Sequence, residues 1–336
     1  MFKNIFKMTR ARLVLDIFLL GCLLAIACAF ASVIWMPGSS YRGAILPFAN
    51  DEQDIEKHLR SYENKLAVEI GQRNSVESLQ KSIQYIEDTL KSFGYEIEEQ
   101  DFTVDGHNFK NISAELTGVS EPKQILLIGA HYDSVNGSPG ANDNGSGVSS
   151  VLEIARQNAG KKNAKTLRFV FFTNEEPPYF SSKEMGSYFY AKQCAERNEN
   201  IIGLLVMETL GYYTDQPNSQ TYPASFVPGY PSTGNFVAFV GNQDSRLLVE
   251  SCVGTFRAEC KFPSEGVSAP NWVNGVDWSD QYWFWRNGYR ALMITDTALY
   301  RYQYYHTLQD TPDKMNFPSF ARVVSGLTKV VGKLVN

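Results

Sequence analysis

Six side chains that can bind a metal ion or move a proton follow apolar runs of this sequence. The run QILLIGA is followed by His131, and twelve residues further on the glycine-rich segment GANDNGSG contains Asp143. The other four follow three more apolar runs: Glu175 and Glu176 after TLRFVFFTN, Glu208 after IIGLLVM, and His306 in the segment after RALMITD. Imidazole and carboxylate groups suit zinc, and a carboxylate shared by two ions is what a two-metal site requires.

This set of residue types is typical of a hydrolytic site with two zinc ions. Two zinc ions about 3.5 to 4 Å apart can activate one water molecule and polarise a carbonyl group together. A carboxylate beside a liganding glutamate, but not itself bound, would take the proton from that water. Singly the residues have ordinary explanations, since Asp143 could cap a helix and the adjacent Glu175 and Glu176 could be solvated. Their common position after apolar runs favours the metal site.

The segments around these residues alternate between expected strands and expected helices. A helical period covers residues 75–93, and EIEEQDFTV with FKNISAEL predicts an edge hairpin. The further strands expected are QILLIGA, TLRFVFFTN, IIGLLVME, FVAFV and RALMITD, and the further helices cover residues 147–158, 184–194, 244–256 and 318–334. This order predicts an α/β fold, a three-layer sandwich with a mostly parallel central sheet flanked by helices. Ligands bind at the carboxyl ends of such strands, so the six residues are expected to meet there.

Three other features bear on the expected domain. The stretch from Thr214 to Thr233, rich in Pro, Ser, Gly and Tyr, is typical of a long surface loop and could wall a substrate cleft. The aromatic residues 282–285 could line a pocket, although such a cluster is more often core. Cys252 and Cys260 could form a disulfide in an oxidising compartment, and their spacing leaves this open.

The N-terminal 35 residues have the pattern of a membrane anchor. Their apolar run, LVLDIFLLGCLLAIACAFASVIW, is long enough for one helix to cross a bilayer. Four lysine and arginine residues precede it, which predicts a cytoplasmic N-terminus and export of the remainder. A cleaved signal peptide or a lipoprotein signal is the alternative, and either would also export the domain. We expect a basic cytoplasmic segment 1–12, a transmembrane anchor 13–35, a linker 36–53 and a catalytic domain 54–336 on the extracytoplasmic side of the inner, cytoplasmic membrane.

Composition and charge exclude other classes of protein. The formal net charge of -5 leaves no basic stripe of the kind that neutralises phosphates, so nucleic acid is not an expected partner. Glycine-rich phosphate loops of the P-loop or dinucleotide type are also missing from the sequence. With 336 residues, of which 43% are hydrophobic, the chain can bury the core of one large domain.

The motifs GAHYDS, GANDNGSG, TNEE, METLGYY and YYHTLQDTPDKM resemble those of the co-catalytic zinc aminopeptidase family, which includes bacterial leucyl aminopeptidases and glutamate carboxypeptidases. The resemblance extends from about residue 75 to the C-terminus. It implies two zinc ions per chain and an aminopeptidase that hydrolyses peptides or N-terminal aminoacyl substrates. The implied roles are the first zinc for His131 and Glu208, the second for Glu176 and His306, the bridge for Asp143 and the general base for Glu175.

The resemblance implies roles for two more residues and also shows two departures. Asp133 would orient His131 by accepting the proton on its second ring nitrogen, and Tyr305 would donate a hydrogen bond to the developing oxyanion. Glu208 stands where many members have the shorter aspartate, which affects the affinity or choice of metal. Gln281 stands where the family often has a histidine that contacts substrate.

Two other functions fit parts of the pattern. Glutaminyl cyclases share the expected fold and use one zinc ion, but the intact NDNGSG turn favours a two-metal hydrolase. A binding ectodomain that has lost catalysis would normally lack ligands or the base, and here all are present. The expected protein is therefore a membrane-anchored exopeptidase, whose side-chain preference and oligomeric state the sequence does not indicate.

Overall fold

The computed structural model describes residues 12–24, 33–223 and 229–336 in two compact units, Met1–Trp35 and Met36–Asn336. The first unit contains a helix over residues 12–24. Across the described ranges, no helix combines the length and the apolar character that crossing a membrane requires. The predicted anchor, 13–35, includes residues 25–32, which lie outside the described part, so the anchor stays a prediction.

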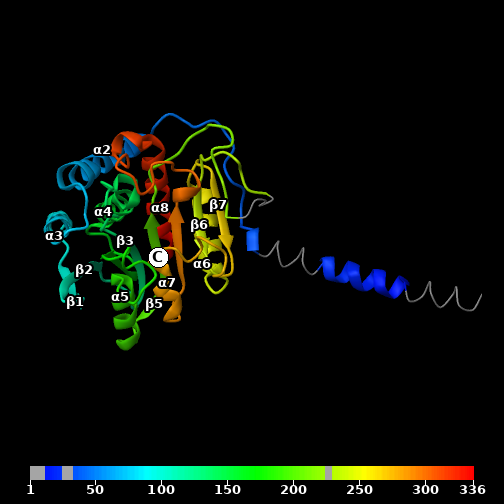
Figure 1. The fold of residues 1–336 in the computed structure, drawn as a ribbon, viewed down its shortest axis with the longest axis horizontal. Coiled ribbons are helices and arrows are strands. Elements are labelled where there is room, and N and C mark those ends of the chain that lie inside the picture. The colour runs from blue at the N-terminus through cyan, green and yellow to red at the C-terminus, as the bar shows by residue number, and fades with distance from the viewer. Residues whose placement is uncertain (1–11, 25–32, 224–228) are drawn as a thin grey trace, which may run out of the picture. The chain divides into compact units, whose positions relative to one another are not determined.

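The second unit is built on one eight-stranded sheet with the strand order β1-β2-β4-β3-β5-β8-β6-β7, which runs from cyan to yellow in Figure 1. The strands are β1 (Ile97–Val104), β2 (His107–Leu116), β3 (Glu121–His131), β4 (Lys165–Phe172), β5 (Asn200–Glu208), β6 (Val237–Gly241), β7 (Ser264–Ser268) and β8 (Ala291–Thr295). The α-helices are α2 (Asn50–Glu63), α3 (Val76–Ser92), α4 (Ser146–Asn158), α5 (Gly186–Glu196), α6 (Arg246–Glu259), α7 (Gln281–Arg286) and α8 (Phe317–Val335). Short helical turns are η1 (Asn64–Ile70), η2 (Ala141–Gly145), η3 (Ala298–Tyr300) and η4 (Pro312–Lys314).

Helices cover both faces of this sheet, which gives the predicted three layers. Successive side chains of a strand point to opposite faces. On one face of β4, the ring of Phe169 contacts Tyr95, whose hydroxyl donates to the carbonyl of Ala155 in α4. On the other face, Phe172 contacts Tyr190 of α5 and Phe284 of α7. The α4 layer also contains α2, α6 and α8, and α8 packs against the other three helices.

The sheet is mixed rather than mostly parallel, which corrects the prediction. The central strands β4, β3, β5 and β8 run parallel to one another. By contrast, β2 runs antiparallel to both β1 and β4, and β6 runs antiparallel to β8. The edge strand β7 pairs with β6 in parallel. Its sequence, SEGVS, lacks the apolar period on which strand prediction depends, so it is not predicted.

The compact unit also begins earlier than residue 54. Met36 is 6% exposed and belongs to the core, and α2 begins at Asn50. The five helices predicted from residue 75 onward agree with α3, α4, α5, α6 and α8 within a few residues, whereas α7 was not predicted. The prediction started too late because the Pro- and Gly-containing stretch after Trp35 has the composition of a tether.

The parallel centre of the sheet brings the candidate residues to one edge. His131 is the last residue of β3 and Glu208 the last of β5, and these strands are paired neighbours. On the other side of β3, His131 pairs in register with Phe172, the last residue of β4. Glu175 and Glu176 follow β4 after two further residues. Three adjacent strands therefore end in groups that can bind a cation.

Candidate metal centre

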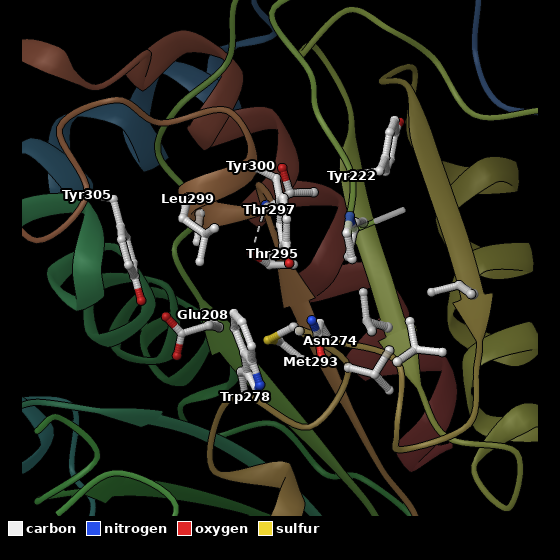
Figure 2. A pocket seen from close by; sticks show the side chains of 18 of the residues that line it. Glu208, Tyr222, Asn274, Trp278, Met293, Thr295, Thr297, Leu299, Tyr300 and Tyr305 are labelled. Atoms are coloured by element: carbon white, nitrogen blue, oxygen red, sulfur yellow. Dashed lines mark hydrogen bonds between the residues drawn. The ribbon is translucent and has the colours of Figure 1, made fainter. Parts of the chain in front are cut away.

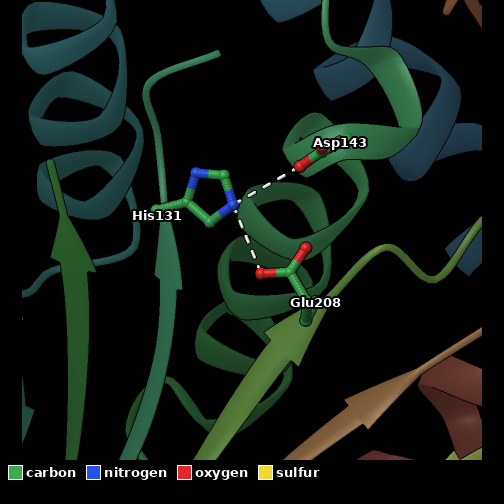
Figure 3. Close-up of side chains that lie close together, drawn as sticks. All are labelled: His131, Asp143 and Glu208. Carbon is green, nitrogen blue, oxygen red and sulfur yellow. Dashed lines mark ion pairs between the residues drawn. The ribbon is translucent and has the colours of Figure 1, made fainter. Parts of the chain in front are cut away.

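The first group of side chains comes from the ends of β3 and β5 and from the glycine-rich turn (Figure 3). Nε2 of His131 lies 3.2 Å from Oε2 of Glu208 and 3.5 Å from Oδ1 of Asp143. All three residues are at most 7% exposed, and their ligand atoms lie within 4.8 Å of one another. The extra methylene of Glu208, compared with aspartate, still allows its carboxylate to reach the imidazole.

The second group shares Asp143 with the first. Nε2 of His306 lies 3.0 Å from Oδ2 of Asp143 and 3.2 Å from Oε2 of Glu176. The two oxygens of one buried carboxylate therefore face two different histidines, one from β3 and one from the loop after β8. This is the arrangement expected of a carboxylate that bridges two ions.

The oxygen and nitrogen atoms of the two groups are better placed to bind metal ions than to form hydrogen bonds with one another. Oδ2 of Asp143 and Nε2 of His306 are buried, and neither makes a hydrogen bond within the described chain. Each group offers one imidazole nitrogen and two carboxylate oxygens, which leaves a coordination position for water or substrate. Three protein ligands with one open position are the pattern of catalytic zinc.

The electrostatics of the cluster also favour bound cations. Burial raises the pKa of Glu175 well above its usual value and that of Glu176 to about 7. Burial lowers the pKa of His306, but its contacts with Asp143 and Glu176 outweigh this and raise it to about 10. Burial opposes ionisation of Asp143, yet the histidines hold its pKa below the usual range. Carboxylates buried this deeply need a positive partner in order to ionise.

The turn that carries Asp143 is held by side chains on both sides of it. The carboxylate of Asp310 accepts hydrogen bonds from the backbone N–H groups of Asn142 and Asp143, at 2.8 and 3.0 Å. Oδ1 of Asn144 accepts from the N–H of Thr209 at 3.0 Å, and its Nδ2 donates to the carbonyl of Met207 at 2.9 Å. These bonds tie the turn to the end of β5, where Glu208 lies.

Asp133 forms hydrogen bonds to the segment that carries the two glutamates. Its two oxygens accept hydrogen bonds from the N–H groups of Glu175 and Glu176, at 3.3 and 3.1 Å. Its Oδ1 lies 3.6 Å from Nδ1 of His131, which is longer than a hydrogen bond. Asp133 therefore fixes the segment after β4 and also lies at ion-pair distance from the imidazole, and its orienting role toward His131 stays a prediction.

A cavity of about 430 Å³ opens from the metal centre across β8, β6 and β7 (Figure 2). Its floor includes one row of paired residues across the sheet, Glu208 of β5, Thr295 of β8 and Ala238 of β6. Figure 2 shows Tyr305 beside Glu208, with its hydroxyl end toward the carboxylate. The ring of Tyr305 stacks on His306, with centroids 3.9 Å apart.

The structure also bears on the predictions for the long loop, the aromatic residues, Gln281 and the two cysteines. Residues 220–223 and Tyr230 of the predicted loop line the cavity, as expected, while 224–228 lie outside the described part. The aromatic residues 283–285 are buried core and do not line the cavity. Gln281 is also buried, and its side chain donates to the carbonyl of Val276. Cys252 and Cys260 are free thiols.

Asp310 and Arg73 are among the residues that support the site and were not predicted. Asp310 lies within YYHTLQDTPDKM, so that motif contains a signal that could have revealed it. Arg73 lies between η1 and α3, far from any motif, and no local pattern marks it.

Comparisons with known proteins agree with this geometry. The model of peptidase family M28 matches residues 111–331. YfbL of Escherichia coli (strain K12), described as uncharacterized, is 34% identical over 263 residues, which are 76% of this chain and 80% of YfbL. The structure of BSAP, a zinc aminopeptidase from Bacillus subtilis, has a TM-score of 0.68 at 15% identity and covers 87% of this chain and 97% of its own.

A glutaminyl cyclase structure from Fimbriiglobus ruber is also similar, with a TM-score of 0.63 at 18% identity, over 87% of this chain and 99% of its own. At these identities the two structures indicate a shared fold. The family model extends over more than half of the chain and includes every residue of the two groups. The chain belongs to peptidase family M28 and is a zinc metallopeptidase.

Proposed function

We propose that this protein is an aminopeptidase whose active site holds two zinc ions. The observation that carries the proposal is Asp143, whose Oδ1 and Oδ2 each face a different histidine, at 3.5 and 3.0 Å. His131, Asp143 and Glu208 would hold one ion, and Asp143, Glu176 and His306 the other. When bound, two zinc ions would polarise the scissile carbonyl and make a water molecule more acidic.

Glu175 is the residue proposed to move the proton. It is 6% exposed, lines the cavity and has its Oε2 3.9 Å from Nε2 of His131. Burial raises its pKa, which makes its carboxylate a stronger base than one in water. Glu175 would take the proton from the attacking water and deliver it to the leaving amine. The backbone bonds to Asp133 would hold Glu175 in place for both transfers.

Tyr305 is proposed to stabilise charge on the reacting carbonyl. Burial and the nearby carboxylates raise the pKa of Tyr305 well above its usual value, so its hydroxyl keeps its proton and remains a donor. It lines the cavity next to the metal groups. A donor placed before the reaction begins stabilises an oxyanion without the cost of reorganising water.

The charges around the cavity favour the amino end of a peptide over its carboxyl end. Two zinc ions would offset the charge of the four carboxylates at the metal centre. The other described residues that line the cavity include one carboxylate, Glu265, and no lysine or arginine. A positive α-amino group is attracted to the remaining negative charge, whereas a terminal carboxylate finds no lysine or arginine among these residues. The apolar wall from Phe236, Val240 and Met293 would accept an apolar side chain of the first residue.

Zinc content and turnover test this proposal together. The purified protein should contain about two zinc ions per chain and release the chromophore from aminoacyl substrates with a free α-amino group. Glu175→Gln should keep the zinc and lose turnover, while Glu196→Gln, an exposed glutamate at the end of α5, serves as the matched control. Turnover of N-acetylated substrates at the same rate would contradict an aminopeptidase.

The same measurement separates this function from that of a glutaminyl cyclase, which the shared fold keeps as the alternative. A cyclase would bind one zinc ion and release pyroglutamate from an N-terminal glutamine. The two groups that share Asp143 favour the two-zinc hydrolase. One zinc ion per chain together with pyroglutamate formation would contradict the hydrolase and indicate a cyclase.

We also propose that the peptidase unit lies outside the cytoplasm, tethered by residues 13–35. The support is the apolar run of those residues and the four basic residues that precede it. A reporter enzyme active only after export, fused after Asn336, should be active. Carbonate washing of membranes should leave the full chain in the membrane fraction and release a chain that begins at Met36.

A further inference from the structure

Arg73 is a fully buried arginine whose guanidinium is surrounded by main-chain carbonyl groups. Its Nε donates to the carbonyl of Tyr132 at 2.8 Å, and its Nη1 and Nη2 donate to those of Pro139 and Gly140, each at 2.7 Å. Tyr132 directly follows the proposed ligand His131, and Gly140 lies three residues before Asp143. One side chain therefore joins the two segments that carry ligands of the same zinc ion.

The backbone of Arg73 is tied to the same place. Its N–H donates to Oγ of Ser134 at 2.9 Å, and its carbonyl accepts from the N–H of Ser134 at 3.2 Å. Oγ of Ser134 in turn donates to the carbonyl of Ser138 at 3.1 Å. Both the main chain and the guanidinium group of Arg73 are therefore held by hydrogen bonds.

Asp310 holds the other side of the turn. Arg73 donates to carbonyl groups that precede Asp143, whereas Asp310 accepts from the N–H groups of Asn142 and Asp143. The carbonyl of Asp310 also accepts from the N–H of Ala141 at 3.2 Å. The positive Arg73 thus contacts carbonyl oxygens of the turn, and the negative Asp310 contacts its N–H groups. Bonds of both kinds leave the backbone of the turn little freedom to move.

We propose that Arg73 is a positioning residue that fixes the Asp143 turn against the end of β3 and thereby sets the affinity for zinc. The proposal rests on the two-zinc function proposed above. A ligand set binds tightly when its atoms are held at coordination distance before the ion arrives. The planar fork of arginine reaches three carbonyl groups at once, which the single ammonium of lysine cannot do in the same geometry.

The position of Arg73 in the chain makes this inference separate from the family match. The matched region is residues 111–331, and Arg73 lies outside it. Through its contacts with Tyr132, Pro139 and Gly140, Arg73 connects the N-terminal part of the second unit to the segments that carry the metal ligands.

The test compares Arg73→Lys with Arg168→Lys in the full chain. Arg168 is a matched control because it is 8% exposed and bonds to Glu115 and Glu199. Zinc affinity is measured by competition with a chelator, and the ligand geometry by the visible absorption of cobalt(II) in place of zinc. Arg73→Lys should fold, bind zinc about 10- to 100-fold more weakly and change the cobalt spectrum, because supporting contacts around metal ligands have effects of that size.

The outcomes are distinguishable. Arg168→Lys should keep the wild-type affinity and spectrum, and equal losses in both variants would mean general destabilisation and overturn the proposal. Wild-type affinity in Arg73→Lys would also overturn it. If Arg73→Lys does not fold, Ser134→Ala takes its place, with weaker zinc binding expected and unchanged binding contradicting the proposal. A wild-type protein that binds no zinc would instead contradict the proposed function.

Discussion

Nε2 of His306 lies 3.0 Å from Oδ2 of Asp143, although His306 follows the last strand and Asp143 lies in the turn after β3. The other oxygen of Asp143 faces His131 at 3.5 Å. Two distant segments therefore meet at one carboxylate, and the loss of that carboxylate should disturb both halves of the site.

Asp143→Asn should abolish binding of both zinc ions, because an amide oxygen is a weaker ligand than a carboxylate and carries no charge. We expect kcat/KM to fall by more than about 100-fold, beyond the range for residues that only support ligands. The measurement is zinc content by mass spectrometry alongside turnover. Asp105→Asn, in the exposed turn between β1 and β2, is the control. Two zinc ions retained by Asp143→Asn would refute the bridge.

Tyr305→Phe should lower kcat by about 100-fold with little change in KM, because one donor to an oxyanion contributes at that level. Zinc content should stay the same, since the hydroxyl is not a proposed ligand. The adjacent Tyr304→Phe removes a hydroxyl that does not line the cavity and should leave kcat as it is. Equal kcat values for the two variants would exclude the donor role of Tyr305.

Ala238→Trp should fill the apolar cavity from its floor. We expect kcat/KM for phenylalanyl and leucyl substrates to fall about 10- to 100-fold and that for alanyl substrates to change much less, because lost apolar contacts in a pocket have effects of this size. Val119→Trp places the same side chain at a residue that is 65% exposed and serves as control. A uniform loss across all substrates would mean that the cavity does not hold the side chain.

Glu63 should make the stability of the protein depend on pH. Burial raises its pKa from 4.5 to about 8, partly opposed by the hydrogen bond from Ser149 and by the charge of Arg73. Because the folded pKa is the higher one, the stability that Glu63 contributes is fully present below pH 4.5 and is lost as the pH rises through 8. Each pKa unit corresponds to about 1.4 kcal/mol, so the loss is at most about 5 kcal/mol.

Glu63→Gln should remove this dependence. The difference in free energy of unfolding between variant and wild type, measured by urea titration of zinc-free protein, should grow in favour of the variant from pH 5 to pH 8.5. Groups common to both proteins cancel in that difference. A constant difference over this range would show that Glu63 does not titrate as described.

The candidate ligands could be predicted from the sequence because strand ends are local features. Apolar runs such as QILLIGA and IIGLLVM mark buried strands, and parallel neighbours end at the same edge, so His131 and Glu208 were expected to meet. The motifs supplied the remaining assignments. Strand direction is different, because it depends on which neighbour a strand pairs with. Only the structure therefore revealed that β6 runs antiparallel to β8 and that the polar segment SEGVS forms an edge strand.

The residue types at the metal centre, the zinc chemistry they indicate and the α/β class were determined by the sequence itself, since each follows from side-chain chemistry or short-range periodicity. The support of that centre was decided by the tertiary structure alone. Arg73 and Asp310, which are far apart in the sequence, hold the Asp143 turn from two sides, and Asp133 forms hydrogen bonds to the N–H groups of Glu175 and Glu176. Such bonds depend on the relative position of segments far apart in the chain, which no local pattern encodes.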